Sequence, residues 1–377
     1  MKLSQTVFTS KLYYRVCCFL LFFVAAAASF NGSYDKWRLD DTEFGSTHGM
    51  CAFEAAIDGT GQRPCVYRQL LPMFANWIDS RFSEQTKDRL FNLKGRTGLL
   101  FRERIIDSFI ARDRTYFLRY WIIYAVEFLF AWISVYAMYL VGKATGFSPP
   151  VAALSAIAMI LIFPYFQEVS GQFYDYPEMA FFMLAVWMAI KLDWWWIVPL
   201  AALASWNKET FLFFIPALYP FIRQRSSRAR TWAGIGVLGL TCAAVDLFLY
   251  LRFLHNPADS SGPHIFEYVT FLPSLFDPRH MVFVKTYGLW ALPSMNIPVI
   301  GLIVWTAWRV WPSLPKVFKR HMQIAAIINI PLFVLVCSAG AMRNLSMLYV
   351  ALLLLLATNL TEWMRGQNNT ATLLSDR

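Results

Sequence analysis

The chain has 377 residues, of which 57% are hydrophobic, 17% are aromatic and only 15% carry a charge. A water-soluble protein of this size exposes far more charged surface, so the composition excludes a soluble globular enzyme. It also excludes a disordered chain and a coiled coil, because both are richer in polar residues. The apolar residues form continuous blocks without the period-two alternation of barrel strands, which excludes a membrane β-barrel.

The formal net charge of +10 does not indicate a nucleic-acid partner. In a membrane protein, much of a basic excess sits in the cytoplasmic loops and sets topology. The six cysteines include no CxxC pair, and four of them lie in apolar blocks, so they do not predict a metal site.

The first apolar stretch runs from Leu12 to Phe30, behind Lys2, Lys11 and Arg15. It ends in AAAASF, which also fits a cleaved signal peptide. Its apolar part is longer than a typical signal-peptide core, so we expect an uncleaved membrane helix. A polar, mixed segment, 31–115, follows it.

A series of further apolar blocks occupies most of the remaining chain. Together with the first stretch they predict an all-α polytopic protein of about ten transmembrane helices, forming one integral membrane domain over 1–377. Three of the blocks are short for a full crossing. The predicted spans are 117–141, 150–165, 177–191 (short), 194–206 (short), 210–222 (short), 231–253, 287–308, 322–338 and 345–361.

The distribution of basic residues predicts the orientation. With the N-terminus in the cytoplasm, most Lys and Arg of the short loops fall on the inner side, as the positive-inside rule requires. The C-terminus is then also cytoplasmic. The large first loop, 31–115, and a second long loop, 254–286, are extracytoplasmic.

Within the first loop, 66–82 and 99–114 place apolar residues on one helical face and are flanked by basic residues. We interpret them as helices lying in the membrane interface, and the alternative is an ordinary small extracytoplasmic subdomain. Cys51 and Cys65 share this loop and are disulfide candidates, since the compartment is oxidising.

An acidic run about ten residues beyond the first span is the leading catalytic candidate. It contains Asp40 and Asp41, the candidate catalytic residues, and Glu43, a candidate to bind substrate. Neighbouring carboxylates repel one another, which raises the pKa of at least one and suits it to act as a base; a pair of them can instead hold a divalent cation. A solvated acidic turn is the simpler alternative.

Further charges lie at other outer membrane boundaries, where they are costly and often mark substrate paths. Each has a simpler structural explanation as a helix cap, an interfacial anchor or a local ion pair. Their placement on one face predicts that Arg68, Asp175, Lys208 and Arg343 converge with Asp40 or Asp41 around one outer cavity. The six boundary charges are all candidates to bind substrate. They are Arg68, Asp175, Glu178, Lys208, Glu209 and Arg343.

Glu127 and Asp246 lie well inside predicted spans, where each needs a buried partner or a water-filled cavity. The outer histidines follow no HxxxH or HExxH pattern, so we expect no zinc site.

The arrangement of an acidic pair in a large first outer loop, interfacial stretches and about ten spans resembles the GT-C superfamily of polytopic glycosyltransferases. YRQLLP (67–72) and NKETFLFFIP (207–216) look like segments of small bacterial members. The resemblance implies a bacterial inner-membrane enzyme that moves a sugar from a polyprenyl-phosphate-linked donor to a glycan, lipid or protein acceptor, with Asp40 or Asp41 as the base. It implies no certain cofactor, although a divalent cation fits the family.

Three alternatives remain open. An O-antigen-type polymerase or ligase also has about ten spans and uses outer arginines, but its large outer loop is expected late in the chain. A lipid-linked-sugar transporter or flippase requires charges deeper within the bundle. A membrane scaffold without catalytic activity is the third.

Overall fold

The computed structural model describes residues 2–34, 53–93, 113–167, 171–258, 265–277, 283–337 and 342–375. Among these residues, six helices are long and apolar enough to cross a membrane. They include α1 (Lys2–Tyr34), α6 (Phe117–Ala144), α7 (Pro149–Phe166), α12 (Arg228–Arg252) and α15 (Lys316–Val336). The sixth joins the 3₁₀ helix η5 (Met342–Leu348) to α16 (Tyr349–Ser375). The chain is therefore an all-α protein of the multi-pass membrane type.

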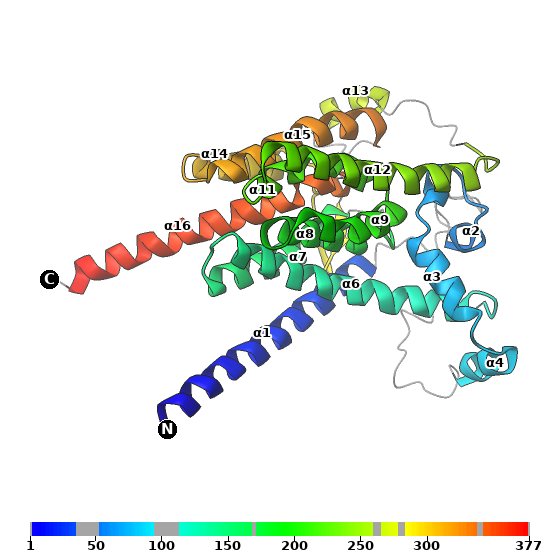
Figure 1. The fold of residues 1–377 in the computed structure, drawn as a ribbon, viewed down its shortest axis with the longest axis horizontal. Helices are drawn as coiled ribbons and strands as arrows, with labels where there is room; N and C mark the ends of the chain where they lie inside the picture. Colours follow the sequence, from blue (N-terminus) through cyan, green and yellow to red (C-terminus); the bar gives the residue numbers. More distant parts are fainter. Residues whose placement is uncertain are drawn as a thin grey trace.

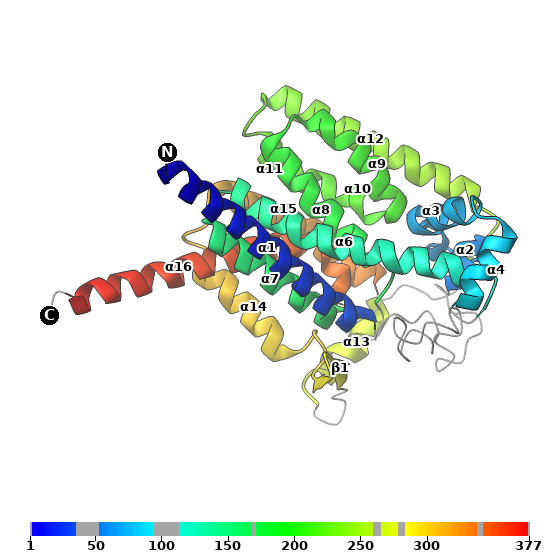
Figure 2. The ribbon, with the colours of Figure 1, turned by 90° about the horizontal axis from the view of Figure 1, so that it is seen from below.

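The helices form one bundle around a single large apolar core (Figure 1). Both termini lie at the same end of the bundle, and α2 (Phe53–Asp58), α3 (Leu70–Asp79) and α4 (Glu84–Leu93) lie at the opposite end (Figure 2). We call the end that carries α2–α4 the distal end.

The hairpin of α6 and α7 shows how local sequence sets the packing. The backbone N–H of Phe147 donates to the Gly142 carbonyl at 3.1 Å, and Gly146, at φ 94°, ends the helix in a Schellman arrangement. Ser148 and Pro149 then start α7. Gly142 brings the two backbones close, because a Cβ added there would lie 2.8 Å from Ala152 Cβ.

Several short helices occupy the middle of the chain. They are α8 (Asp175–Lys191), η2 (Trp194–Trp196), α9 (Ile197–Asn207), α10 (Thr210–Phe214), η3 (Ile215–Leu218) and α11 (Tyr219–Ile222). The start of α8 and the end of α9 are buried inside the bundle. Ser205, near the end of α9, donates to Asp246 Oδ1 of α12 at 2.6 Å. Six more residues of α12 follow Asp246, so α12 extends about 9 Å farther toward the distal end.

The register of α6 against α8 shows that the start of α8 likewise lies well below the distal end of its neighbour. Ser134 Oγ lies 3.2 Å from the Tyr176 carbonyl, so α8 begins at the height of Ser134. That height is 17 residues, or about 25 Å, along α6 from Phe117. The start of α8 and the end of α9 are therefore recessed below the distal ends of α6 and α12.

The described part of the first loop fills this recess. Helix α3 packs on α6 and touches α9. Asn256, just beyond α12, donates to the carbonyls of Gly59 and Gly61. The 3₁₀ turn η1 (Cys65–Tyr67) runs between these anchors and leads directly to Arg68.

Several sequence predictions need correction. The stretch 66–82 is not one continuous helix, because η1 and a short connection precede α3. Within α3, Leu71 and Ala75 are buried, whereas Phe74 and Trp77 stack together on the exposed side. Most of 99–114 lies outside the described residues. The three short blocks are confirmed as helical, but none is long enough to cross a bilayer alone.

The predicted span 287–308 is wrong over 287–296, nearly half of its length. A hairpin of β1 (Val284–Thr286) and β2 (Leu289–Ala291) occupies that region, turning at Tyr287 and Gly288, which both have positive φ. The membrane-type helix starts later, as α14 (Ile297–Val310), where the Asn296 side chain caps the Val299 N–H at 2.9 Å. Helix α13 (Ile265–Ser274) lies in the second long loop and contacts α15.

Candidate functional site

A buried ion pair between Lys208 and Glu178 lies at the centre of the recess. Lys208 follows the end of α9, and Glu178 lies in the first turn of α8, with Nζ and Oε2 2.7 Å apart. Their side chains are 5% and 4% exposed. Oε1 of Glu178 accepts from Thr210 Oγ1 at 2.6 Å and from Ser346 Oγ at 2.7 Å. This carboxylate therefore joins α8, α9, α10 and η5.

Arg68 enters the recess from the first loop. Its Nη2 lies 2.9 Å from Glu209 Oε1, and its Nη1 donates to the Tyr174 hydroxyl. The guanidinium also lies 4.4 Å from the centre of the Tyr174 ring, and Lys208 Nζ lies 5.4 Å from the same ring. Tyr174 thus contacts two cations that lie 140 positions apart in the sequence.

The third ion pair joins the C-terminal part of the chain to α8. Arg343 Nη1 lies 3.2 Å from Asp175 Oδ1 and 3.3 Å from Oδ2. Oδ2 also accepts from Gln167 Nε2 at 3.1 Å and from the Gln172 backbone N–H at 2.9 Å. The Arg343 carbonyl in turn accepts from the Tyr349 hydroxyl at 2.9 Å.

Three cations and three carboxylates are therefore paired within one site, which we call the ion cluster: Arg68, Lys208, Arg343, Asp175, Glu178 and Glu209. Burial lowers the pKa of Arg68, but the charge of Glu209 outweighs it and the pKa rises. Burial also lowers the pKa of Lys208, and the charge of Glu178 raises it more. For Glu209, burial raises the pKa, but the charge and hydrogen bonds of Arg68 lower it overall. All three groups are thus held in their charged forms.

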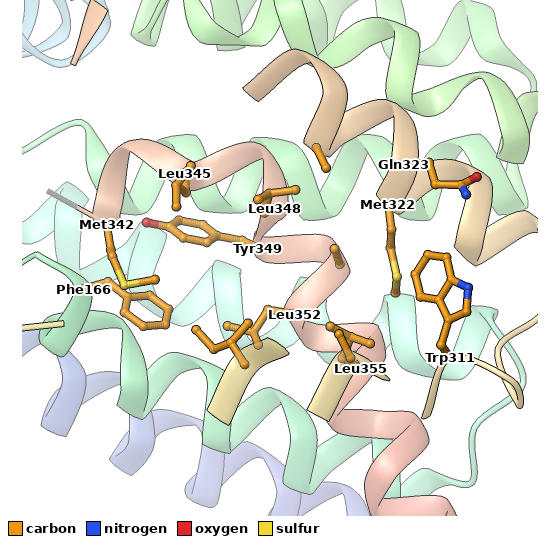
Figure 3. A pocket seen from close by; sticks show the side chains of 14 residues that line it. Phe166, Trp311, Met322, Gln323, Met342, Leu345, Leu348, Tyr349, Leu352 and Leu355 are labelled. Atoms are coloured by element: carbon orange, nitrogen blue, oxygen red, sulfur yellow. The ribbon is translucent and has the colours of Figure 1, made fainter. Parts of the chain in front are cut away.

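An apolar groove begins beside the ion cluster. It has a volume of about 310 Å³ and lies between α14, α15 and α16. Figure 3 shows Met342, Leu345 and Tyr349 at one end of the groove and Trp311 and Met322 at the other. Met342 and Leu345 directly precede Arg343 and Ser346 in sequence, so one end of the groove adjoins the cluster. From residue 345 to residue 355 the helix rises about 15 Å, which sets the length of the groove.

The structure brings together all six boundary charges that the sequence singled out. Their partners are distant in sequence, with separations of 30, 141 and 168 positions, so local pairing of Lys208 with Glu209 does not occur. The acidic-run residues Asp40, Asp41 and Glu43 lie outside the described residues. Cys65 is disulfide-bonded, and its predicted partner Cys51 also lies outside the described residues.

Sequence reasoning missed the polar residues that connect the ion pairs. Tyr174, Thr210 and Ser346 are ordinary residue types near span ends, and only their positions beside Asp175, Glu209 and Arg343 could have suggested a role. The sequence predicted that Glu127 and Asp246 each need a buried partner or a water-filled cavity, and the structure shows a partner for only one of them among the described residues. Asp246 accepts a hydrogen bond from Ser205, whereas neither carboxylate oxygen of Glu127 has a hydrogen-bond partner among the described residues.

The carboxylates of the cluster do not fit a divalent cation, because a cationic side chain already binds each one. In the parts of the chain that the structure describes, no three His, Cys, Asp or Glu side chains are grouped as metal ligands. No family model, curated protein or solved structure matches this chain.

Proposed function

We propose that the protein is a membrane glycosyltransferase that moves a sugar from a polyprenyl-phosphate-linked donor to an acceptor at the distal end of the bundle. The observation that supports this most strongly is the apolar groove that adjoins a buried ion cluster. A lipid-linked sugar has the same division between a long apolar chain and a charged phosphate. The groove suits the chain, and the cationic side of the cluster suits the phosphate.

In this proposal Arg343 and Arg68 bind the donor phosphate. Each guanidinium uses part of its donor set on a carboxylate, and Arg343 Nε has no partner among the described residues. A developing phosphate leaving group gains from such fixed donors because they need no reorganisation during the reaction. The three carboxylates hold the cations in place before substrate arrives.

Asp40 or Asp41 is proposed as the base that removes the acceptor proton. Helix α1 ends at Tyr34, and Ser33 lies 2.7 Å from the Tyr176 hydroxyl, one residue from Asp175. Asp41 is seven positions beyond Tyr34, and an extended chain of that length spans at most about 25 Å. An acid at 40 or 41 is therefore within reach of the ion cluster.

The orientation is part of the same proposal. The termini, α11 and the start of α12 lie together at one end of the bundle (Figure 2). Arg223, which follows α11, and Arg225 and Arg228 also lie there, and the positive-inside rule supports a cytoplasmic location for that end. A cysteine at Ser227 should resist an impermeant thiol reagent in intact cells. Labelling of that cysteine from outside the cell would contradict the proposed orientation.

Transport of a lipid-linked sugar is the second candidate. The ion cluster is recessed below the distal ends of α6 and α12, and charges deep within a bundle are what a transporter requires. The two functions differ in the fate of the glycosidic bond, which a transferase breaks and a transporter leaves intact.

The test uses purified protein in nanodiscs with a panel of polyprenyl-phosphate-linked sugars and candidate acceptors. Transfer activity predicts loss of the lipid-linked sugar and formation of free polyprenyl phosphate. The Asp40→Asn/Asp41→Asn double variant should lose about 10²–10⁴ in rate while remaining folded. Movement of intact donor across a proteoliposome membrane, without cleavage, would support transport instead.

A further inference from the structure

Helix α13 exposes a row of large apolar side chains on one side. Phe266, Val269 and Leu272 follow one another at intervals of three residues, and they are between 50% and 71% exposed. Phe276, in the turn that follows the helix, is 76% exposed. Side chains three and four residues apart share a helix face, so these residues form a continuous apolar surface. Such a surface marks contact with an apolar partner.

The other two sides of α13 differ in character. Tyr268 is buried, its hydroxyl donates to the Phe333 carbonyl of α15 at 3.3 Å, and the two rings meet edge to face with centres 5.7 Å apart. Glu267 and Ser274 are seven residues apart and share a third side. The helix therefore has one side against the protein, one polar side and one apolar side. This division is typical of a helix that lies in the plane of a membrane interface.

The place where α13 crosses α15 agrees with an interfacial position. Phe333 is three residues before Val336, where α15 ends, and α15 is a candidate membrane span. The crossing therefore lies about 5 Å from the distal end of that span. Ile330 and Val336 flank Phe333 on the same side of α15, and both are exposed. The apolar surface of α13 is thus continuous with an exposed apolar side of a candidate membrane span.

The hairpin of β1 and β2 also presents apolar side chains away from the bundle. The Tyr287 hydroxyl donates to the Leu161 carbonyl of α7 at 2.9 Å, about 8 Å along α7 from its end at Phe166. Leu289 and Trp290, directly after the turn, are 72% and 70% exposed. Figure 2 shows the hairpin projecting from the side of the bundle, next to α14. The turn is therefore held below the distal end of a second candidate span.

The register of the hairpin adds a basic residue to this surface. Lys285 pairs with Trp290 across the two strands, so both side chains lie on the same face of the hairpin. Both residues are exposed. Tryptophan is enriched at the membrane–water interface, and a lysine there can extend its ammonium group to the lipid phosphates. This face of the hairpin therefore fits the boundary between lipid chains and headgroups.

We propose that α13 and the β1–β2 hairpin lie in the interfacial layer of the bilayer at the distal end, with their exposed apolar side chains among the lipid chains. The partner is lipid, because both separate elements lie beside the ends of candidate spans, where the bilayer is the surrounding medium. Ala326 lines the groove seven residues before Phe333, so the groove lies about 10 Å deeper in the membrane than α13. This inference does not depend on the glycosyltransferase proposal.

The experiment measures depth with an environment-sensitive fluorescent amino acid, introduced by amber suppression into the full-length chain in phosphatidylcholine nanodiscs. The labelled positions are Val269 and Leu289, and Glu267, on the polar side of the same helix, is the matched control. The quenchers are phosphatidylcholine brominated along its chains and iodide in the water. Labels at 269 and 289 should be quenched by the brominated chains, at a depth of about 5–10 Å below the headgroup boundary. The label at 267 should be quenched by iodide.

Two results would overturn the proposal. Quenching of the labels at 269 and 289 by iodide, and not by brominated lipid, would show that both elements lie in water. Protection of these labels from both quenchers would show that protein covers them, as in an assembly with a second copy of the chain.

Stability in nanodiscs gives a second readout that needs no label. Val269→Asp hardly changes the stability of a helix that faces water, but it is costly when the side chain faces lipid. The variant should therefore lower the unfolding temperature in nanodiscs. Gln85→Asp, at an exposed position of α4, is the control and should leave the unfolding temperature unchanged. Equal unfolding temperatures of wild type and Val269→Asp would contradict an interfacial position of α13.

Discussion

Lys208 Nζ and Glu178 Oε2 are 2.7 Å apart, in a site where both side chains are almost completely buried. Glu178 lies on α8 and Lys208 follows the end of α9, and Glu178 also accepts hydrogen bonds from Thr210 and Ser346. This pair fixes the end of α9 against the start of α8, and it positions Tyr174 between Lys208 and Arg68.

Removing one partner of this pair should be much worse than removing both. Lys208→Met leaves the Glu178 carboxylate buried without its cation, at a cost of about 3–5 kcal/mol. Glu178→Gln added to Lys208→Met removes that unpaired charge and should recover part of the loss. Denaturant unfolding in detergent measures both, with Lys191→Met as the exposed control. Equal losses in the single and double variants would show that the pair is not coupled.

A second prediction concerns the close packing of α6 on α7. Gly142→Ala places a Cβ 2.8 Å from Ala152 Cβ and 3.1 Å from its Cα, so the backbones must move apart. Such overpacking typically costs about 1–3 kcal/mol. Gly236→Ala on α12 meets nothing within 4 Å and should stabilise the protein by about 0.5–1 kcal/mol. The two unfolding temperatures should move in opposite directions. If Gly142→Ala leaves the unfolding temperature unchanged, α6 and α7 tolerate a wider separation of their backbones.

The spans could be predicted because hydropathy is a local property. Six blocks are helices long enough to cross a membrane, and the three short blocks are helical and short as expected. The hairpin at 284–291 was missed because Leu289 and Trp290, both highly exposed, raise the hydropathy of a segment that does not form a helix. Tyr287-Gly288 and Asn296 were the local signals of a turn and a helix start.

The site was predictable as a set of residues but not as a set of contacts. A charge at a span end is costly wherever it lies, so Arg68, Asp175 and Arg343 could be identified from the sequence alone. Their pairing depends on how far α8 and α9 stop below α6 and α12, which is a property of the packed bundle. The unpartnered oxygens of Glu127 likewise became visible only when neighbouring helices were in place.

The pH dependence of stability should reveal the Arg68–Glu209 pair. The pKa of Glu209 is lowered from 4.5 in the folded protein, with Arg68 outweighing the effect of burial. The unfolded chain therefore binds the proton first as pH falls, and the contribution of the pair is complete above about pH 4.5 and is lost below it. The difference in unfolding temperature between wild type and Glu209→Gln should be constant from pH 8 to 5 and should shrink below that range.

Glu209 is one-third exposed, so solvent weakens this pair and the effect should be smaller than for Lys208 and Glu178. A difference that grows as the solution is acidified would contradict the assigned direction of the pKa shift.

Filling the groove should reduce donor binding without unfolding the protein. Ala307→Trp and Ala326→Trp each project a large side chain into the 310 Å³ space between α14, α15 and α16. If the donor chain lies there, the apparent KM for a lipid-linked sugar should rise at least about tenfold, the effect of losing about 1.4 kcal/mol of binding energy. Ala243→Trp, on the exposed side of α12, is the control. Equal KM values in all three variants would show that the lipid chain of the donor does not bind in this groove.

The most direct test of the central proposal is photo-crosslinking with a polyprenyl phosphate that carries a photoreactive group in its chain, followed by peptide mapping. The proposal that the groove and the ion cluster bind one lipid-linked substrate predicts crosslinks in α14 and in η5–α16, competed by unlabelled lipid-linked sugar. Crosslinking should fall in Arg343→Ala, because that variant loses a phosphate ligand while the groove itself is unchanged. Crosslinks spread over the lipid-exposed helices, unaffected by competitor and by Arg343→Ala, would contradict it.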